Sequence, residues 1–140
     1  MKIEKYMLET AKALLKENRV MLWSYENSIV ISNDGHFAMF VPREKFIFNV
    51  EPNGAFTGML PRDWECHEMR YTDTCEQCGK TLCRVLESVS GKWKTLIDEK
   101  FLKYFDMNTN IKFYQPYEKA AVVATEFGKL CAIIMPFVKK

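Results

Sequence analysis

Apolar residues recur with helical spacing near the start of the chain. The positions i, i+4, i+7 and i+8 of this segment hold Met7, Ala11, Leu14 and Leu15. Such spacing places side chains on one face of an α-helix, so the pattern predicts an amphipathic helix over residues 3–17 with these four side chains buried. The opposite face carries most of the lysines of the segment, which are Lys5, Lys12 and Lys16.

Short apolar runs separated by turn residues predict strands in the rest of the first half. Asn33-Asp34-Gly35 is a strong hairpin signal, because glycine reaches positive φ without steric cost, and Pro42 ends the strand that follows. Prolines and glycines interrupt residues 51–63, which we expect to form a loop. The predicted strands are residues 20–25, 28–32, 36–41 and 46–50.

The second half is predicted to follow the same plan. Strands over residues 66–72 and 81–90 flank a turn that contains cysteines. A short helix over residues 99–105 follows, because Asp98 can cap it, and Ile97 and Leu102 have the spacing of a hydrophobic staple. Three further strands are expected at residues 110–115, 120–125 and 130–135.

The two halves therefore have a similar order of elements, in which a helix precedes a meander of strands that ends in proline. The segments that carry this repeat are IVISNDGHFAMFVP and VVATEFGKLCAIIMP. Each meander needs one face covered, and the two helices are natural covers. The sequence predicts a single α+β domain over residues 1–140, with two β-α-β-β-β-type halves and two helices packed on antiparallel sheets.

Composition narrows the class of protein. A chain of 140 residues suits one domain, and 48% apolar residues can build a core, which argues against disorder. No apolar run reaches about 18 residues, and Glu4 and Glu9 interrupt the N-terminal segment. We therefore expect a cytoplasmic protein with no membrane partner. The formal net charge of +2 argues against a strongly basic nucleic-acid binder.

The cysteines allow two interpretations. An odd number of thiols without a recognisable secretion signal favours reduced cysteines over a disulfide framework. The run CEQCGK at residues 75–80 resembles a zinc knuckle, although the further ligands have irregular spacing. The alternative is an ordinary β-hairpin at about residues 66–90. We expect no cofactor, with zinc as the alternative, held by Cys66, Cys75, Cys78 and Cys83.

The C-terminal part of the chain resembles one domain of the DNA sliding clamps, chiefly the C-terminal domain of the β subunit of DNA polymerase III. FLKYF at residues 101–105 stands where that domain has its second helix, and NIKFY at residues 110–114 resembles the strand after it. The last hairpin of that clamp domain is similar to residues 121–124 and 130–136 of this chain. The second of these segments is an apolar strand that ends in Met-Pro. The first half matches in plan but not in motif, and the cysteine hairpin lies outside the family pattern.

The resemblance implies a non-enzymatic DNA-replication accessory or processivity-related factor. It would contact DNA weakly and without sequence specificity, through lysine and arginine side chains on its helices. The candidates by position are Lys5, Lys12, Lys16, Arg19, Lys100 and Lys103. It also implies an apolar pocket for short partner peptides, with Met135, Pro136 and Phe137 as candidates. A ring would need about six chains of this length, and the sequence leaves the oligomeric state open.

Two other classes of function compete with a clamp-like factor. A protein-interaction module of the phage or mobile-element type, without DNA binding, fits the 14% aromatic content. An enzyme is disfavoured, because His36 and His67 are the only histidines and the chain has no nucleophile elbow or phosphate loop.

Overall fold

The strands of the protein form one continuous antiparallel sheet. The computed structural model describes residues 1–16, 19–56 and 60–138. Within these residues the strands pair in the order β1-β2-β3-β9-β8-β7-β4-β5-β6. They are β1 (Met21–Tyr25), β2 (Ser28–Ser32), β3 (Phe37–Pro42), β4 (Glu68–Cys78), β5 (Thr81–Ser88), β6 (Lys94–Asp98), β7 (Ile111–Tyr114), β8 (Val122–Glu126) and β9 (Lys129–Ile134). The helices are α1 (Ile3–Leu15) and the 3-10 helices η1 (Arg43–Lys45), η2 (Trp64–Cys66) and η3 (Glu99–Tyr104). The predicted α+β class is confirmed.

The strand order is symmetric about the contact between β3 and β9. The meander β1-β2-β3 meets this contact from one side and β7-β8-β9 from the other, and Phe37 pairs with Ile134 across it. α1 precedes the first meander and η3 precedes the second. The repeat noted in the sequence is therefore a feature of the topology, and both halves share a single sheet.

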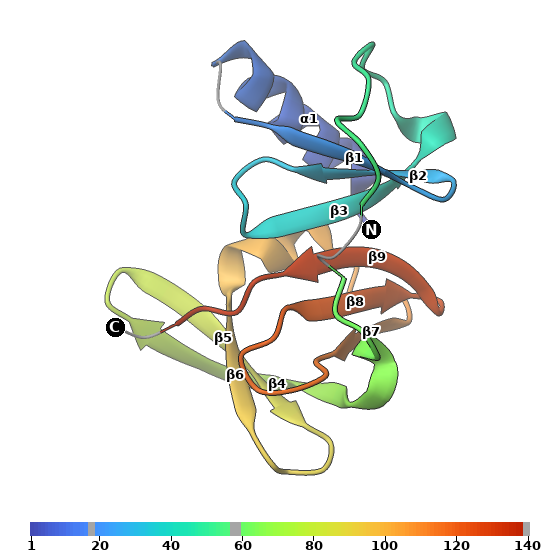
Figure 1. Cartoon of the computed structure of the whole chain (residues 1–140). Coiled ribbons are helices and arrows are strands. Elements are labelled where there is room, and N and C mark those ends of the chain that lie inside the picture. The colour runs from blue at the N-terminus through green and yellow to red at the C-terminus, as the bar shows by residue number, and fades with distance from the viewer. Residues whose placement is uncertain (17–18, 57–59, 139–140) are drawn as a thin grey trace.

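The strands β4, β5 and β6 extend this sheet beyond β7, and both of its edges meet other segments. Figure 1 shows α1 and β1–β3 in the upper part of the molecule and β4–β9 in the lower part. The N–H of Phe137, after β9, donates to the carbonyl of Leu96 in the edge strand β6 at 2.7 Å. At the other edge, Ser24 of β1 donates to the Gly54 carbonyl and accepts from the N–H of Phe56. The sheet is therefore curved, so that the segment after β9 reaches the edge strand β6.

Apolar side chains cover both faces of the sheet, because neighbouring residues of a strand point to opposite sides. In β3, Phe37, Met39 and Val41 belong to the larger core cluster, which includes side chains of α1 and η3. Ala38 and Phe40 point the other way, into a smaller cluster that Phe56 of the long loop completes. One face is therefore covered by helices and the other by the loop.

The predicted buried face of α1 is partly wrong. Met7 is buried as expected, but Leu14 and Leu15 are 37% and 86% exposed. The buried face instead contains Tyr6 and Thr10, whose hydroxyls donate at 3.0 Å to the carbonyls of Ile31 and of Tyr6 itself. Polar groups with satisfied hydrogen bonds can occupy a core, so the helix turns these residues inward and leaves two leucines in solvent.

The strand prediction has three further errors. Residues 46–50 do not form a strand, although Phe46 and Phe48 pack against the core. The prediction missed β6, whose inward residues are Thr95 and Ile97. β4 also extends to Cys78, so the cysteines lie in a strand and not in the turn.

The predicted second helix is present as a six-residue 3-10 helix, η3. Its cap is as expected, because the Asp98 carboxylate accepts the N–H of Lys100 at 3.0 Å. Arg84 of β5 holds η3 on the sheet, donating from Nε and Nη2 to the two carboxylate oxygens of Glu99 at 3.0 and 2.8 Å.

In the described part of the chain, no helix has the length and apolarity needed to span a membrane.

We expect Arg84→Ala to destabilise the fold more than Arg70→Ala. The Arg84 and Glu99 side chains are only 15% and 28% exposed, and Arg84 also donates to the Thr72 carbonyl. Loss of these charged hydrogen bonds should lower the free energy of unfolding by about 2 kcal/mol. Arg70 pairs with Glu87 but is 64% exposed, so its loss should cost less than about 1 kcal/mol. Urea unfolding of both variants checks this, and equal losses would contradict it.

Candidate functional site

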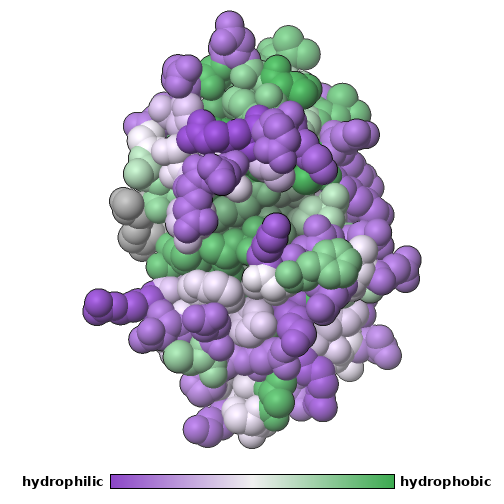
Figure 2. Space-filling model, turned by 90° about the vertical axis from the view of Figure 1, so that its right-hand side faces the viewer, coloured by the Kyte–Doolittle hydropathy of each residue, from purple (hydrophilic) through white to green (hydrophobic). Residues whose placement is uncertain are grey.

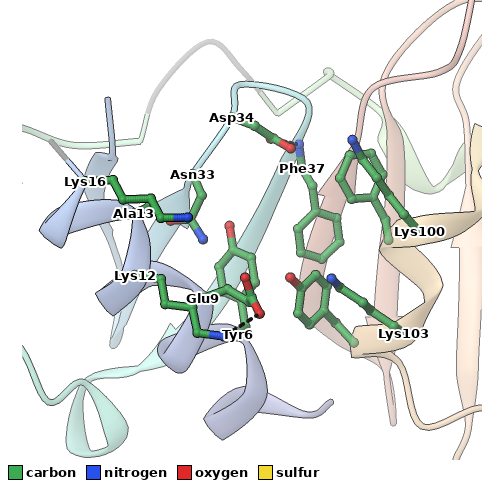
Figure 3. A pocket seen from close by; sticks show the side chains of 12 residues that line it. Tyr6, Glu9, Lys12, Ala13, Lys16, Asn33, Asp34, Phe37, Lys100 and Lys103 are labelled. Atoms are coloured by element: carbon green, nitrogen blue, oxygen red, sulfur yellow. Dashed lines mark hydrogen bonds and ion pairs between the residues drawn. The ribbon is translucent and has the colours of Figure 1, made fainter. Parts of the chain in front are cut away.

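A cleft of about 300 Å³ separates α1 from η3 on the helix-covered side of the sheet. The hairpin turn between β2 and β3 closes one end of it. Figure 3 shows side chains from all three elements pointing toward this space. The lining residues are Tyr6, Glu9, Lys12, Ala13, Lys16, Asn33, Asp34, Phe37, Lys100, Phe101, Lys103 and Tyr104.

Aromatic rings fix the distance between the two walls. Tyr6 of α1 meets Tyr104 of η3 edge-on, with ring centroids 4.9 Å apart, and meets Phe37 at 5.4 Å. Phe37 stacks on Phe101 at 5.2 Å. The N–H of Lys2 adds a hydrogen bond of 2.8 Å to the Tyr104 carbonyl. Because these groups are packed before any ligand arrives, the cleft is preorganised.

Four lysines stand at the edge of the cleft, two on each wall. Lys12 and Lys16 extend from α1, while Lys100 and Lys103 extend from η3. All four are exposed. The ammonium groups of Lys100 and Lys103 lie 5.1 and 5.0 Å from the ring centroids of the residues that follow them. Such contacts hold the charge near the surface. The ammonium of Lys100 also forms an ion pair with the Asp98 carboxylate at 3.7 Å.

The two carboxylates of the cleft are already engaged. Asp34 accepts the N–H groups of His36 and Phe37 at 2.9 and 3.1 Å, which closes the hairpin turn. Glu9 lies 3.7 Å from the ammonium of Lys12, one turn along α1. Hydrogen bonds do not remove the charge of either carboxylate, and Asp98 adds a third beside the ammonium of Lys100. Four lysines against these three carboxylates leave a small positive excess, which favours an anionic ligand.

Burial changes the acidity of the two phenols in the cleft. Burial raises the pKa of Tyr6 far above its ordinary value of 10.0. Burial, with smaller contributions from Glu9 and Asp34, raises the pKa of Tyr104 to about 12. Both phenols are therefore neutral near neutral pH, so neither adds negative charge to the cleft.

The structure separates the remaining DNA-contact candidates from the cleft. Lys5 lines a different groove on the other flank of α1. Arg19 is exposed beyond the end of α1. Of the six predicted contacts, the cleft thus brings together the four lysines named above.

The three candidates for a peptide pocket lie beside this cleft. Met135, Pro136 and Phe137 line a cavity of about 350 Å³ together with Lys100 and Phe101, which also line the cleft. The cavity exists because the chain leaves the sheet after β9 and crosses toward β6. A peptide pocket at these residues stays a prediction.

The cysteines are not assembled into a metal site. Cys75 pairs with Arg84 while Glu76 pairs with Cys83, so Cys75 and Cys83 lie on opposite faces of the hairpin. Cys66 belongs to η2, outside the hairpin. Within the described residues, no three side chains of the metal-binding types His, Cys, Asp and Glu come together. Burial, followed by the neighbouring Cys78 thiol, raises the pKa of Cys83 to about 12.

A wider cavity of about 950 Å³ lies between the β1–β2 turn and the β8–β9 turn. Figure 2 shows this side of the molecule, with hydrophobic surface across its middle and hydrophilic residues around it. The charged residues that line the cavity have both signs and are Glu26, Arg43, Glu44, Glu126 and Lys129. Such a mixed rim gives no preference for an anion.

Sequence reasoning found the lysines of the cleft but missed its other parts. The sequence pattern indicates Asn33 and Asp34 only as turn residues, and the apolar spacing does not place Tyr6 on the buried face. The side-chain oxygen of Asn33 is buried without a hydrogen-bond partner in the described part of the chain. The available signal for this buried face is the spacing of Tyr6 and Thr10, which lie one helical turn apart on a lysine-rich helix.

Comparison with known proteins gave no match: no family model, no curated protein and no solved structure is significantly similar to this chain. Function is therefore inferred from the geometry of the cleft and from its charges.

The buried phenols predict a loss of stability in alkaline solution. A tyrosine whose folded pKa is raised stabilises the fold fully below its unfolded pKa of 10.0, and this contribution is lost as the pH rises toward 12. The free energy of unfolding should fall over this window, and Tyr104→Phe should make the fall shallower. Urea unfolding at several alkaline pH values measures it. Tyr117→Phe is the control, since Tyr117 is 63% exposed. An equal change in both variants would contradict the assignment.

Proposed function

We propose that this protein is a non-enzymatic, clamp-like module that contacts the phosphate backbone of DNA through the cleft between α1 and η3. The observation that carries the proposal is that four lysines from two separate helices line one preorganised cleft. A role as a DNA-replication accessory factor is the context that the resemblance to sliding clamps implies.

The chemistry of the cleft fits phosphate better than bases. Lysine is a flexible point charge that contacts phosphate but provides no planar fork for reading base edges. Lys12 and Lys16 are one helical turn apart, so both can face a single strand. Lys100 and Lys103 bring two further charges from the opposite wall. Binding through such contacts should be weak, independent of sequence and sensitive to salt.

The topology supports the clamp-like part of the proposal. The two meanders meet at β3 and β9, and the helices that precede them, α1 and η3, pack side by side through Tyr6 and Tyr104. The basic surface thus arises where the two halves of the repeat meet. Two features depart from the resemblance: η3 is a short 3-10 helix, and β4, β5 and β6 extend the sheet.

The two edge strands of the sheet already form hydrogen bonds with other segments of the chain, which favours a protein that acts as a monomer. A ring built by continuing sheets from chain to chain needs free edge strands. Here Ser24 in β1 bonds to Gly54 and Phe56, and Leu96 in β6 accepts from Phe137. We therefore propose that the chain approaches DNA from one side as a monomer.

Removal of the cleft charges should abolish most of the DNA binding. We expect the wild-type chain to bind a fluorescein-labelled duplex at low salt with a slope of log affinity against log salt of about −3 to −4, as four phosphate contacts require. In a variant that combines Lys12→Gln, Lys16→Gln, Lys100→Gln and Lys103→Gln, affinity should fall at least tenfold and the slope should approach zero. Fluorescence anisotropy over a salt series measures both.

The matched control replaces four exposed lysines outside the cleft by glutamine: Lys80, Lys92, Lys94 and Lys129. Its net charge equals that of the cleft variant, so it should retain most of the affinity and slope. If the control loses as much binding as the cleft variant, only net charge matters and the cleft is not the site. Binding that persists at high salt in the wild-type chain would also contradict the proposal.

The occupied sheet edges predict a monomer. Sedimentation equilibrium should give a mass of 16.4 kDa from low micromolar to several hundred micromolar protein. A long duplex should bind several chains independently, with no closed assembly of about six chains. A stable ring, with or without DNA, would show that the edges open and would overturn this part of the proposal.

A further inference from the structure

A second groove, of about 870 Å³, runs along the other flank of α1. One wall is α1 itself, and the other is η1 with the residues that follow it. The lining residues are Met1, Lys2, Ile3, Glu4, Lys5, Met7, Leu8, Ala11, Lys45 and Ile47. The basic cleft uses different positions of the same helix, such as Glu9 and Lys12, so the two sites do not share a residue.

Large apolar side chains are exposed at this groove. Leu8 is 57% exposed, and Ile47 on the facing wall is 74% exposed. Leu15 is 86% exposed and follows Leu8 by seven residues, so it continues the same line along α1. Ala11 lies between these leucines, where its small side chain allows close approach of another backbone. Apolar groups in this arrangement favour a partner that buries them.

The charged side chains around the groove are mostly positive. Lys2, Lys5 and Lys45 are all exposed, and none of the three forms an ion pair with another residue that the structure describes. Glu4 is the one acidic residue among those that line the groove. A partner therefore needs apolar side chains along its centre and negative charges along its flanks.

We propose that this groove binds an acidic amphipathic helix of a partner protein. The 13 residues of α1 span about 20 Å, so a matching helix has about 14 residues. Its apolar residues, spaced by three or four positions, would contact Leu8, Ala11 and Ile47. Its acidic residues would meet the lysines at the rim.

Other occupants fit this groove less well. DNA has no apolar stripe to cover Leu8 and Ile47. A second copy of α1 would bring its own Lys2 and Lys5 toward the same lysines, which is repulsive. A membrane presents a plane, whereas this site is concave between α1 and the segment around Ile47.

The test uses three fluorescein-labelled helical peptides of about 14 residues. All three carry leucine at the same helical spacing, and the remaining positions are mainly glutamate, glutamine or lysine. We expect the order of affinity to be glutamate, then glutamine, then lysine. The double variant Leu8→Glu with Ile47→Glu should weaken binding of the glutamate peptide at least tenfold.

The matched control is Val89→Glu with Tyr117→Glu, since these residues are 62% and 63% exposed away from the groove. It adds the same two charges and should leave the affinity unchanged. The variant that combines Lys12→Gln, Lys16→Gln, Lys100→Gln and Lys103→Gln should also leave it unchanged. This last result separates the inference from DNA binding. No binding of the glutamate peptide, an equal loss in the control, preference for anionic vesicles, or a homodimer that Leu8→Glu dissociates would each overturn the proposal.

Discussion

The ring of Tyr6 packs edge-on against both Phe37 and Tyr104, while its hydroxyl donates to the Ile31 carbonyl. One side chain thus joins α1 to the sheet and to η3. The same contact sets the rotation of α1 about its axis, because Tyr6 can reach these partners only if Leu8 and Leu15 turn outward. The basic cleft on one flank of α1 and the apolar groove on the other are both consequences of this orientation.

The orientation explains how a chain with a net charge of only +2 can present a basic site. Three acidic residues lie near the cleft: Asp34 accepts hydrogen bonds in the turn, Glu9 pairs with Lys12, and Asp98 pairs with Lys100. The lysines project from two short elements held together by aromatic packing. Local arrangement, and not overall charge, therefore determines where an anion is attracted.

Much of the fold could be predicted from sequence because its signals are local. The hairpin at Asp34-Gly35 and the cap at Asp98 depend on residues a few positions apart, and both are found in the structure. The rotation of α1 could not be predicted, because it depends on the Ile31 carbonyl as a partner for Tyr6. Phe46 and Phe48 likewise alternate as in a strand, but they pack against the core without pairing in the sheet. The lysines are candidates from the sequence alone, but their meeting in one cleft follows from tertiary contacts.

The central claim is that DNA lies in the cleft between α1 and η3. The most direct measurement is a titration of the ¹⁵N-labelled protein with a short duplex, followed by amide chemical shifts. The largest changes should occur in residues 9–16, in the turn at residues 33–35 and in residues 99–104. Changes centred instead on the β4–β5 hairpin, or on residues 135–138 without η3, would contradict it.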